Sequence, residues 1–227
     1  MKKSLFTIVF ALSILGVFCG IFLHIKWFDY FFKPLIMFSV GGYFLLNSNN
    51  IQKNVVRIAT FAFLFSWFGD IFLMFASDGN IYFMVGLACF LIAQIFYITL
   101  FRKTIKLSGR EPFLRRNKIY LIAYILYGAT IYYLLFNHLD IVLKIAVFMY
   151  MSAILGMSAM ALNRYKTVSI ISFSTVFFGS VLFVISDSLI AIDKFYIIIP
   201  NDRIFVMSTY IAAQYLIMRG VLKQFVI

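Results

Sequence analysis

Long apolar runs, each about the length of a membrane crossing, follow one another through most of this 227-residue chain. The hydrocarbon core of a bilayer needs ~20 consecutive apolar residues per helix, and short polar connections separate the runs here. Hydrophobic residues make up 64% of the chain and charged residues only 12%, a balance far from that of a water-soluble domain. The sequence therefore predicts an integral membrane protein with no soluble domain.

The polar connections divide the chain into eight predicted spans. Because the runs are long and lack the period-two alternation of barrel strands, we interpret them as helices. The predicted fold class is all-α, a polytopic helical membrane protein that forms one domain over residues 1–227. The spans are expected at residues 4–25, 30–47, 56–76, 81–101, 119–136, 141–162, 168–191 and 204–221.

The basic residues set the predicted orientation. A net charge of +12 would suggest nucleic acid for a soluble protein, but in a membrane protein Lys and Arg concentrate in cytoplasmic loops. We therefore expect no nucleic-acid partner and both termini in the cytoplasm. The bacterial cytoplasmic membrane is the preferred location because the chain is compact, and a eukaryotic internal membrane is the alternative. This orientation leaves on the outer side, of the 20 basic residues, only Lys26, Lys33, Lys144, Lys194 and Arg203.

A weak internal repeat relates the third and fourth spans to the seventh and eighth. Gly69–Leu73 resembles Ser186–Ile190, and Ala93–Tyr97 resembles Ala213–Ile217. Because four spans separate the copies, both would run in the same direction, as in a four-plus-four parallel duplication. The aspartate of each copy would then face its counterpart across the repeat axis. Chance similarity between two apolar hairpins is the alternative.

Four ionisable residues fall inside predicted spans, namely Lys33, Asp70, Lys144 and Asp187. Each costs about 2.5 to 3.5 kcal/mol on insertion scales and is by default a candidate for function. Distances along the spans put Lys33 and both aspartates in the outer half of the bilayer. An Asp70–Lys33 ion pair, or a capping role for Asp187, is the structural interpretation. The functional interpretation is a carboxyl group that burial keeps protonated near neutral pH.

Two glutamines lie near the middle of predicted spans, each with a tyrosine close by in the sequence. Gln94 and Gln214 are expected either to form interhelical hydrogen bonds or to contact a substrate, and Tyr97 and Tyr215 fit both roles.

Metal chemistry finds little support in the sequence. His24 and His138 are the only histidines, both near predicted helix ends, and no zinc or phosphate-binding motif occurs. Cys19 and Cys89 fall in apolar runs, where packing is their expected role. No metal and no cofactor is predicted.

Several short motifs occur in a fixed order along the chain. They are Lys33-Pro34-Leu35, Gly69-Asp70-Ile71-Phe72-Leu73-Met74, the stretch 86–97, Ser186-Asp187-Ser188, and Ala213-Gln214 with Gly220. Together they resemble the lysoplasmalogenase family of YhhN-like membrane proteins, over nearly the whole chain from about residue 30 to residue 220. One position departs from the family pattern, because a histidine is expected where this chain has Gln94.

The resemblance implies a hydrolase that cleaves the vinyl-ether bond of lysoplasmalogens, releasing a fatty aldehyde and glycerophosphoethanolamine or glycerophosphocholine. This hydrolysis begins with protonation of the alkenyl carbon, and water then attacks the oxocarbenium ion. Two carboxyl groups in different protonation states can supply that chemistry, as they do in glycosidases.

The resemblance and the buried charges select the same residues. Asp70 is expected to be the general acid and Asp187 the anionic stabiliser and base, with the reverse assignment open. The groups expected to bind the lysophospholipid substrate are Lys33, Gln94, Tyr97 and Gln214. The alternatives are a lipid or small-solute transporter with an intramembrane Asp/Lys site, and a structural or sensory membrane protein in which Asp70 and Lys33 are a packing pair.

Overall fold

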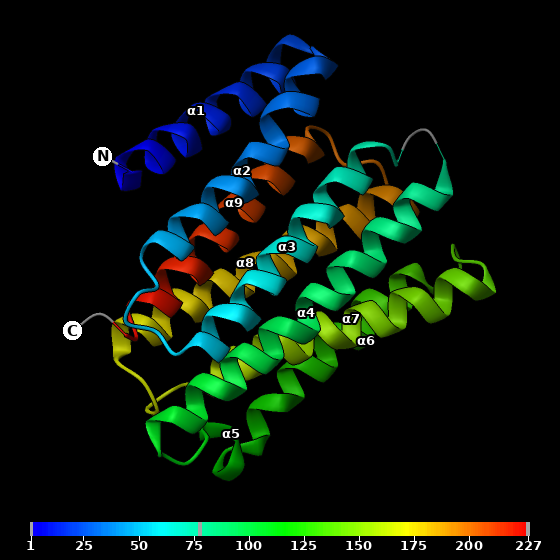
Figure 1. Ribbon diagram of the computed structural model, residues 1–227. Coiled ribbons are helices and arrows are strands. Elements are labelled where there is room, and N and C mark those ends of the chain that lie inside the picture. Colours follow the sequence, from blue (N-terminus) through cyan, green and yellow to red (C-terminus); the bar gives the residue numbers. More distant parts are fainter. Residues whose placement is uncertain (1, 77–78, 226–227) are drawn as a thin grey trace. The chain divides into compact units, whose positions relative to one another are not determined.

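The computed structural model describes residues 2–76 and 79–225, and in that part of the chain it contains helices and turns but no strand. Two short elements, α5 (Phe113–Arg116) and the 3-10 helix η1 (Lys118–Tyr120), lie between longer helices. The all-α prediction is confirmed. The long helices in Figure 1 are α1 (Lys2–Leu23), α2 (Lys26–Leu46), α3 (Lys53–Met74), α4 (Asn80–Ser108), α6 (Leu121–Phe136), α7 (Ile141–Leu162), α8 (Ile170–Phe195) and α9 (Asp202–Leu222).

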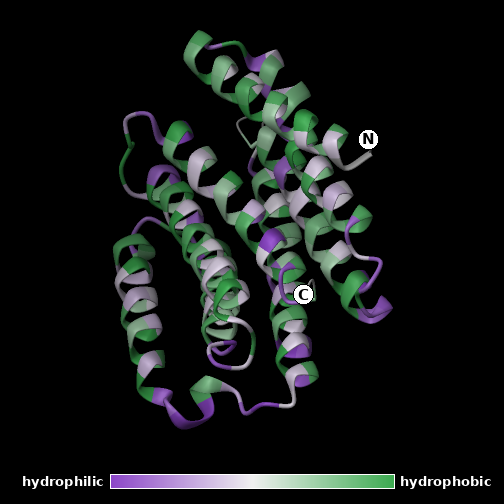
Figure 2. Ribbon diagram, turned by 90° about the vertical axis from the view of Figure 1, so that its left-hand side faces the viewer, coloured by the Kyte–Doolittle hydropathy of each residue, from purple (hydrophilic) through white to green (hydrophobic). Residues whose placement is uncertain are grey.

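Seven helices in the described part of the chain are long and apolar enough to cross a membrane. The remaining long helix is α2, whose first turns carry Lys26, Asp29 and Lys33. Figure 2 shows hydrophobic residues along the helices and hydrophilic residues gathered in the connecting segments. A polytopic membrane protein is therefore confirmed, while the cytoplasmic location of the termini stays a prediction.

The chain divides into two compact units, and the boundary falls inside α4, between Tyr97 and Ile98. The first unit contains α1, α2, α3 and the first part of α4; the second contains the end of α4 and the helices up to Gln224. The single domain over residues 1–227 and the four-plus-four repeat stay predictions.

In the first unit, aromatic rings pack directly against glycines of α1 and α2. A Cβ atom at Gly16 would lie 2.3 Å from the ring of Phe32, and one at Gly42 would lie 2.1 Å from the ring of Phe6. Helices in membranes associate by close van der Waals packing, and small residues allow that approach. These two contacts hold α1 against α2.

Close approach of α8 and α9 organises the second unit. A Cβ atom at Gly220 would lie 2.5 Å from Cγ2 of Val176 and 2.8 Å from its backbone nitrogen. A Cβ atom at Gly179 would lie 3.0 Å from the carbonyl oxygen of Ala213. The backbones of α8 and α9 are therefore in close contact at both glycines. This contact fixes how α8 lies along α9.

Arg164, in the turn after α7, is fully buried and joins several segments of the second unit. Its Nη2 atom donates to Oγ of Ser172 at 2.9 Å and to Oε1 of Gln224 at 2.8 Å. Its guanidinium carbon lies 5.5 Å from the centre of the Phe101 ring. Burial lowers the pKa of Arg164 to about 9, so the side chain remains a cation at neutral pH.

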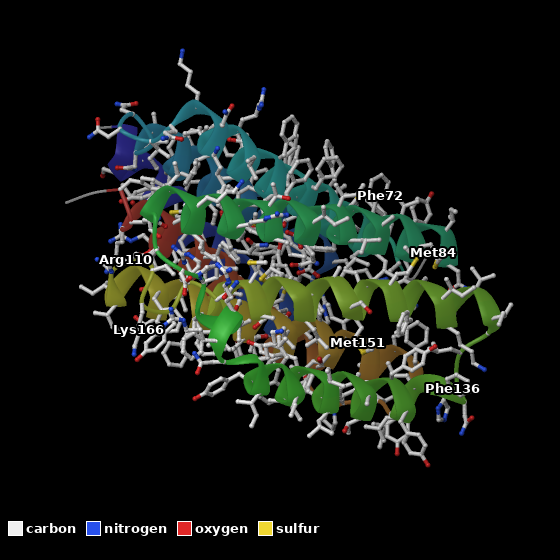
Figure 3. The ribbon with its side chains drawn as sticks, turned by 90° about the horizontal axis from the view of Figure 1, so that it is seen from below. Phe72, Met84, Arg110, Phe136, Met151 and Lys166 are labelled. Carbon is white, nitrogen blue, oxygen red and sulfur yellow. The ribbon has the colours of Figure 1, made fainter. Side chains whose placement is uncertain are left out.

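The loop after α4 contacts the turn between α7 and α8. Arg110 donates to the carbonyl oxygen of Lys166 at 3.2 Å, and Figure 3 shows these two residues at the end of the second unit opposite Phe136. Lys166 and Gly109 both have left-handed backbone conformations, with φ of 61° and 66°. Of the two, glycine adopts this conformation without steric cost.

Candidate active-site residues

Asp70 lies in the last two turns of α3 and is 2% exposed. It shares the buried face of α3 with Phe63, Ser66 and Gly69, as the spacing of three and four residues requires for one side of a helix. A carboxyl group at such a position is costly to ionise unless other groups stabilise it. Asp70 is thus buried in the first unit, as the sequence predicted.

The contacts between α3 and α4 show which residues lie opposite one another. A Cβ atom at Gly69 would lie 2.5 Å from the Phe90 ring, and the rings of Phe65 and Phe96 stack at 5.8 Å. Gln94 lies between Phe90 and Phe96 along α4, and it therefore comes level with the residues just before Asp70.

Gln94 is 0% exposed, and neither its Nε2 nor its Oε1 atom has a hydrogen-bond partner in the described part of the chain. The same holds for the hydroxyl groups of Ser39 in α2 and Ser66 in α3, which are also buried. The sequence pointed to Gln94 but gave no sign of the two serines.

Lys33 lies in α2 and is half-buried. The next residue, Pro34, accepts a hydrogen bond from Nε1 of Trp67 at 2.9 Å. Because Trp67 is three residues before Asp70 in α3, Lys33 and Asp70 lie within about one helical turn of each other along the helices. The ion pair between Lys33 and Asp70 stays a prediction.

In the second unit, Asp187 and its two neighbours in α8 contact three different helices. Asp187 accepts a hydrogen bond from the hydroxyl group of Tyr150 in α7. Ser188 accepts from Tyr127 in α6 at 2.8 Å, and Ser186 donates to the carbonyl oxygen of Val206 in α9 at 3.2 Å. The Ser-Asp-Ser motif is therefore a junction of α6, α7, α8 and α9.

Tyr150 is a site residue that sequence reasoning missed. It is one of 14 tyrosines, and it lies in the middle of an apolar helix with no motif around it. Its hydroxyl group stabilises the carboxylate of Asp187, because a hydrogen bond to a charged acceptor is stronger than one between neutral groups.

Other predicted polar residues of the second unit have internal partners. Gln214 is fully buried in α9, and its Nε2 atom donates to the hydroxyl oxygen of Tyr210 at 3.3 Å. Lys144, in the first turns of α7, has its Nζ atom 4.0 Å from the centre of the Phe136 ring. Each of these two side chains therefore has a contact inside the second unit. Tyr97, in the first unit, is also fully buried, with its ring 6.0 Å from that of Phe63.

The acidic, histidine and cysteine side chains of the described residues do not gather in groups of three or more that could hold a metal ion. Cys19 and Cys89 are free thiols.

Together, the fold and these groups define a polytopic α-helical membrane protein with an aspartate inside a helix of each of its two units. The model of the YhhN family matches residues 28–221, and the chain belongs to this family. It is 31% identical over 161 residues to "Lysoplasmalogenase TMEM86A" of Homo sapiens, which covers 68% of this chain and 60% of the human protein. It is 30% identical over 189 residues to "Lysoplasmalogenase TMEM86A" of Bos taurus, covering 81% of this chain and 70% of the bovine protein.

The match with the human relative thus spans less than two thirds of that protein's length. No solved structure matches the chain. Both aspartates lie inside the region that the family model covers.

Proposed function

We propose that this chain is a membrane-embedded hydrolase that cleaves the vinyl-ether bond of lysoplasmalogens. The products would be a fatty aldehyde and a glycerophospho-alcohol such as glycerophosphoethanolamine or glycerophosphocholine. Membership of the YhhN family, with relatives named lysoplasmalogenase, supports this activity. The burial of Asp70 in a membrane helix is the structural observation that carries the chemistry.

The reaction needs one proton donor, one anion and one water molecule. A carboxylic acid gives its proton to the alkenyl carbon farther from the ether oxygen. The electrons of the double bond form the new C–H bond, and the carbon next to the oxygen becomes part of an oxocarbenium ion. Water adds to the cationic carbon and loses a proton to a carboxylate, which forms a hemiacetal. The hemiacetal then breaks its bond to the glycerol oxygen, which takes the proton that the second carboxyl group received from water. As the carbonyl forms, the hemiacetal hydroxyl group returns a proton to the first carboxylate. The net reaction consumes one water molecule and regenerates both carboxyl groups.

In this proposal Asp70 is the general acid and Asp187 is the anionic stabiliser and base. A buried carboxyl favours its protonated form because desolvation penalises the charge. Asp187 is half-buried and accepts a hydrogen bond from Tyr150, which favours the anion. The two environments thus support different protonation states, the property that acid–base pairs of carboxyl groups exploit.

Substrate contacts complete the proposal. Lys33 is half-buried and lies within about one turn of Asp70 along the helices, and its ammonium group is assigned to the phosphate of a lysophospholipid. Gln94, Tyr97 and Gln214 are assigned to the glycerol and alkenyl parts. We place the chain in the bacterial cytoplasmic membrane, where a single-chain lipid reaches the site laterally from the bilayer.

The test is to incubate the purified chain in detergent with an alkenyl lysophospholipid and with its alkyl analogue, and to measure fatty aldehyde. We expect aldehyde from the alkenyl lipid alone, and none from Asp70→Asn or Asp187→Asn. Asp140→Asn is the matched control, because Asp140 caps α7 by accepting from the Leu143 amide at 2.8 Å and asparagine caps equally well.

Full activity in either site variant would contradict the mechanism. No aldehyde from folded protein with several headgroups, together with movement of the lipid across sealed vesicles, would instead favour a transporter.

A further inference from the structure

Three buried polar side chains of the first unit, Ser39, Ser66 and Gln94, are not satisfied by the described residues. Such groups are rare in folded proteins, because a buried polar atom without a hydrogen bond costs free energy. Serine in a helix usually avoids this cost by donating to the carbonyl four residues earlier. Ser13 does so in the same unit, donating to Val9 at 2.7 Å. Ser39 and Ser66 do not, so their hydroxyl groups are available to a ligand.

The helix contacts place the three residues at one depth. On α2, Ser39 lies between Pro34 and Phe44, whose partners on α3 are Trp67 and Phe63. Ser66 of α3 lies between those two partners. On α4, Gln94 lies between Phe90 and Phe96, which contact Gly69 and Phe65 on either side of Ser66. All three residues are buried, and they lie at a similar level along α2, α3 and α4, the neighbouring helices of the first unit in Figure 1.

An aromatic layer lies next to the three polar side chains of Ser39, Ser66 and Gln94, on one side of them. The ring of Phe63 lies 5.3 Å from that of Phe44 in α2 and 6.0 Å from that of Tyr97 in α4. Phe63 precedes Ser66 by three residues, and Tyr97 follows Gln94 by three, so the aromatic layer is about one turn away in both helices. On the other side, Asp70 follows Ser66 by four residues, and side chains at that spacing are neighbours on a helix.

We propose that Ser39, Ser66 and Gln94 form a binding site for a hydroxyl-bearing ligand, either water or the free sn-2 hydroxyl group of a lysolipid, next to Asp70. The two serine hydroxyl groups both donate and accept, and the amide offers two donors and an acceptor. A hydroxylic ligand needs this mixture, whereas a cation or an anion needs acceptors alone or donors alone. Only the ligand's role beside Asp70 rests on the proposed hydrolysis; the binding itself does not.

Two measurements distinguish bound water from the sn-2 hydroxyl group of a lysolipid, and neither of them measures turnover. In the first, the full chain in detergent without lipid is exposed to X-rays, which produce hydroxyl radicals from bound water, and oxidised side chains are located by mass spectrometry. If the site holds water, the buried rings of Phe63 and Tyr97 are oxidised several times faster than the equally buried ring of Phe183 in the second unit. In Gln94→Leu this excess is lost, and in Ser13→Ala it is retained.

The second measurement compares the binding of a 1-O-alkyl lysophospholipid with that of its 2-deoxy analogue, neither of which contains a vinyl ether. If the lipid hydroxyl occupies the site, the first lipid binds about fivefold tighter, as expected for one neutral hydrogen bond. Gln94→Leu and Ser66→Ala remove this preference, and Ser13→Ala keeps it.

Ser66→Ala serves in both measurements if Gln94→Leu fails to fold. A positive result in either measurement supports the site and identifies its ligand. Equal labelling of all three rings, together with equal binding of the two lipids, would overturn the proposal whether or not the chain hydrolyses vinyl ethers.

Discussion

Replacing Gly220 by alanine should destabilise the second unit, because α8 leaves no space for a methyl group there. The new Cβ atom would lie 2.5 Å from Cγ2 of Val176, 2.8 Å from its backbone nitrogen and 3.2 Å from the carbonyl oxygen of Ser172. Two of these three atoms are backbone, so α8 itself must move. The carbonyl oxygen of Gly220 also accepts a hydrogen bond from Ser172 at 2.7 Å, and a shift of α8 would weaken it.

The expected size follows from two opposing terms. Overpacking in a closed core costs about 1 to 3 kcal/mol, and a backbone clash belongs at the upper end of that range. Alanine recovers up to about 1 kcal/mol over glycine in a helix interior. The net expectation for Gly220→Ala is a loss of about 2 kcal/mol, which lowers Tm by about 4 to 8 °C for a chain of this size.

Gly156→Ala in α7 is the matched control. The nearest atom to its new Cβ would be Cδ1 of Ile98 at 3.6 Å, an ordinary contact, so Tm should stay the same or rise slightly. Thermal unfolding in detergent, followed by circular dichroism, measures both variants. Equal Tm values for Gly220→Ala, Gly156→Ala and the parent chain would refute the packing described for α8 and α9.

Two further changes test the polar contacts of the second unit. Tyr150→Phe removes the donor to Asp187, and we expect kcat for aldehyde release to fall about tenfold or more with Tm unchanged. The control Tyr132→Phe loses only a hydrogen bond to the Lys144 carbonyl and should keep full activity. Equal rates in the two variants would contradict the role of Tyr150. Arg164→Lys keeps the charge but lacks the planar fork that reaches Ser172 and Gln224 together, so unfolding measurements should show a loss of about 2 kcal/mol, whereas exposed Arg110→Lys should change little.

The apolar runs predicted where helices cross the membrane better than where they end. The span predicted at 141–162 coincides with α7, but α4 continues to Ser108, seven residues beyond the predicted end at residue 101. Arg102, Lys103 and Lys106 end the apolar run without ending the helix, because long basic side chains extend toward polar surroundings from a continuous helix. The helix ends only where Gly109 takes a left-handed conformation.

The sequence likewise predicted some of the candidate site residues and missed others. Asp70 and Asp187 stand out in the sequence because a carboxyl group inside an apolar run is costly wherever it points. Ser39 and Ser66 do not, because a helical serine normally satisfies itself on its own backbone, as Ser188 does with Val184 at 2.8 Å. Only the structure shows that Ser39 and Ser66, among the described residues, do not form this hydrogen bond.

The mechanism makes a geometric demand that can be tested directly. If Asp70 and Asp187 act on one bond, the proposed mechanism predicts carboxyl groups about 5 to 9.5 Å apart, as in glycosidases. In a chain with Cys19→Ala and Cys89→Ala, the pair Asp70→Cys and Asp187→Cys should therefore be joined by a thiol-specific reagent that spans ~8 Å.

The control pair is Asp70→Cys with Asp140→Cys. Asp187 contacts Tyr150, and Asp140 precedes Tyr150 by ten residues, or ~15 Å along α7, so this pair should react far more slowly. Equal rates for the two pairs, or no crosslink between positions 70 and 187 in detergent and in bilayers, would show that the aspartates do not share a substrate. Because both cysteine pairs carry Asp70→Cys, a difference between them reports distance and not the reactivity of position 70.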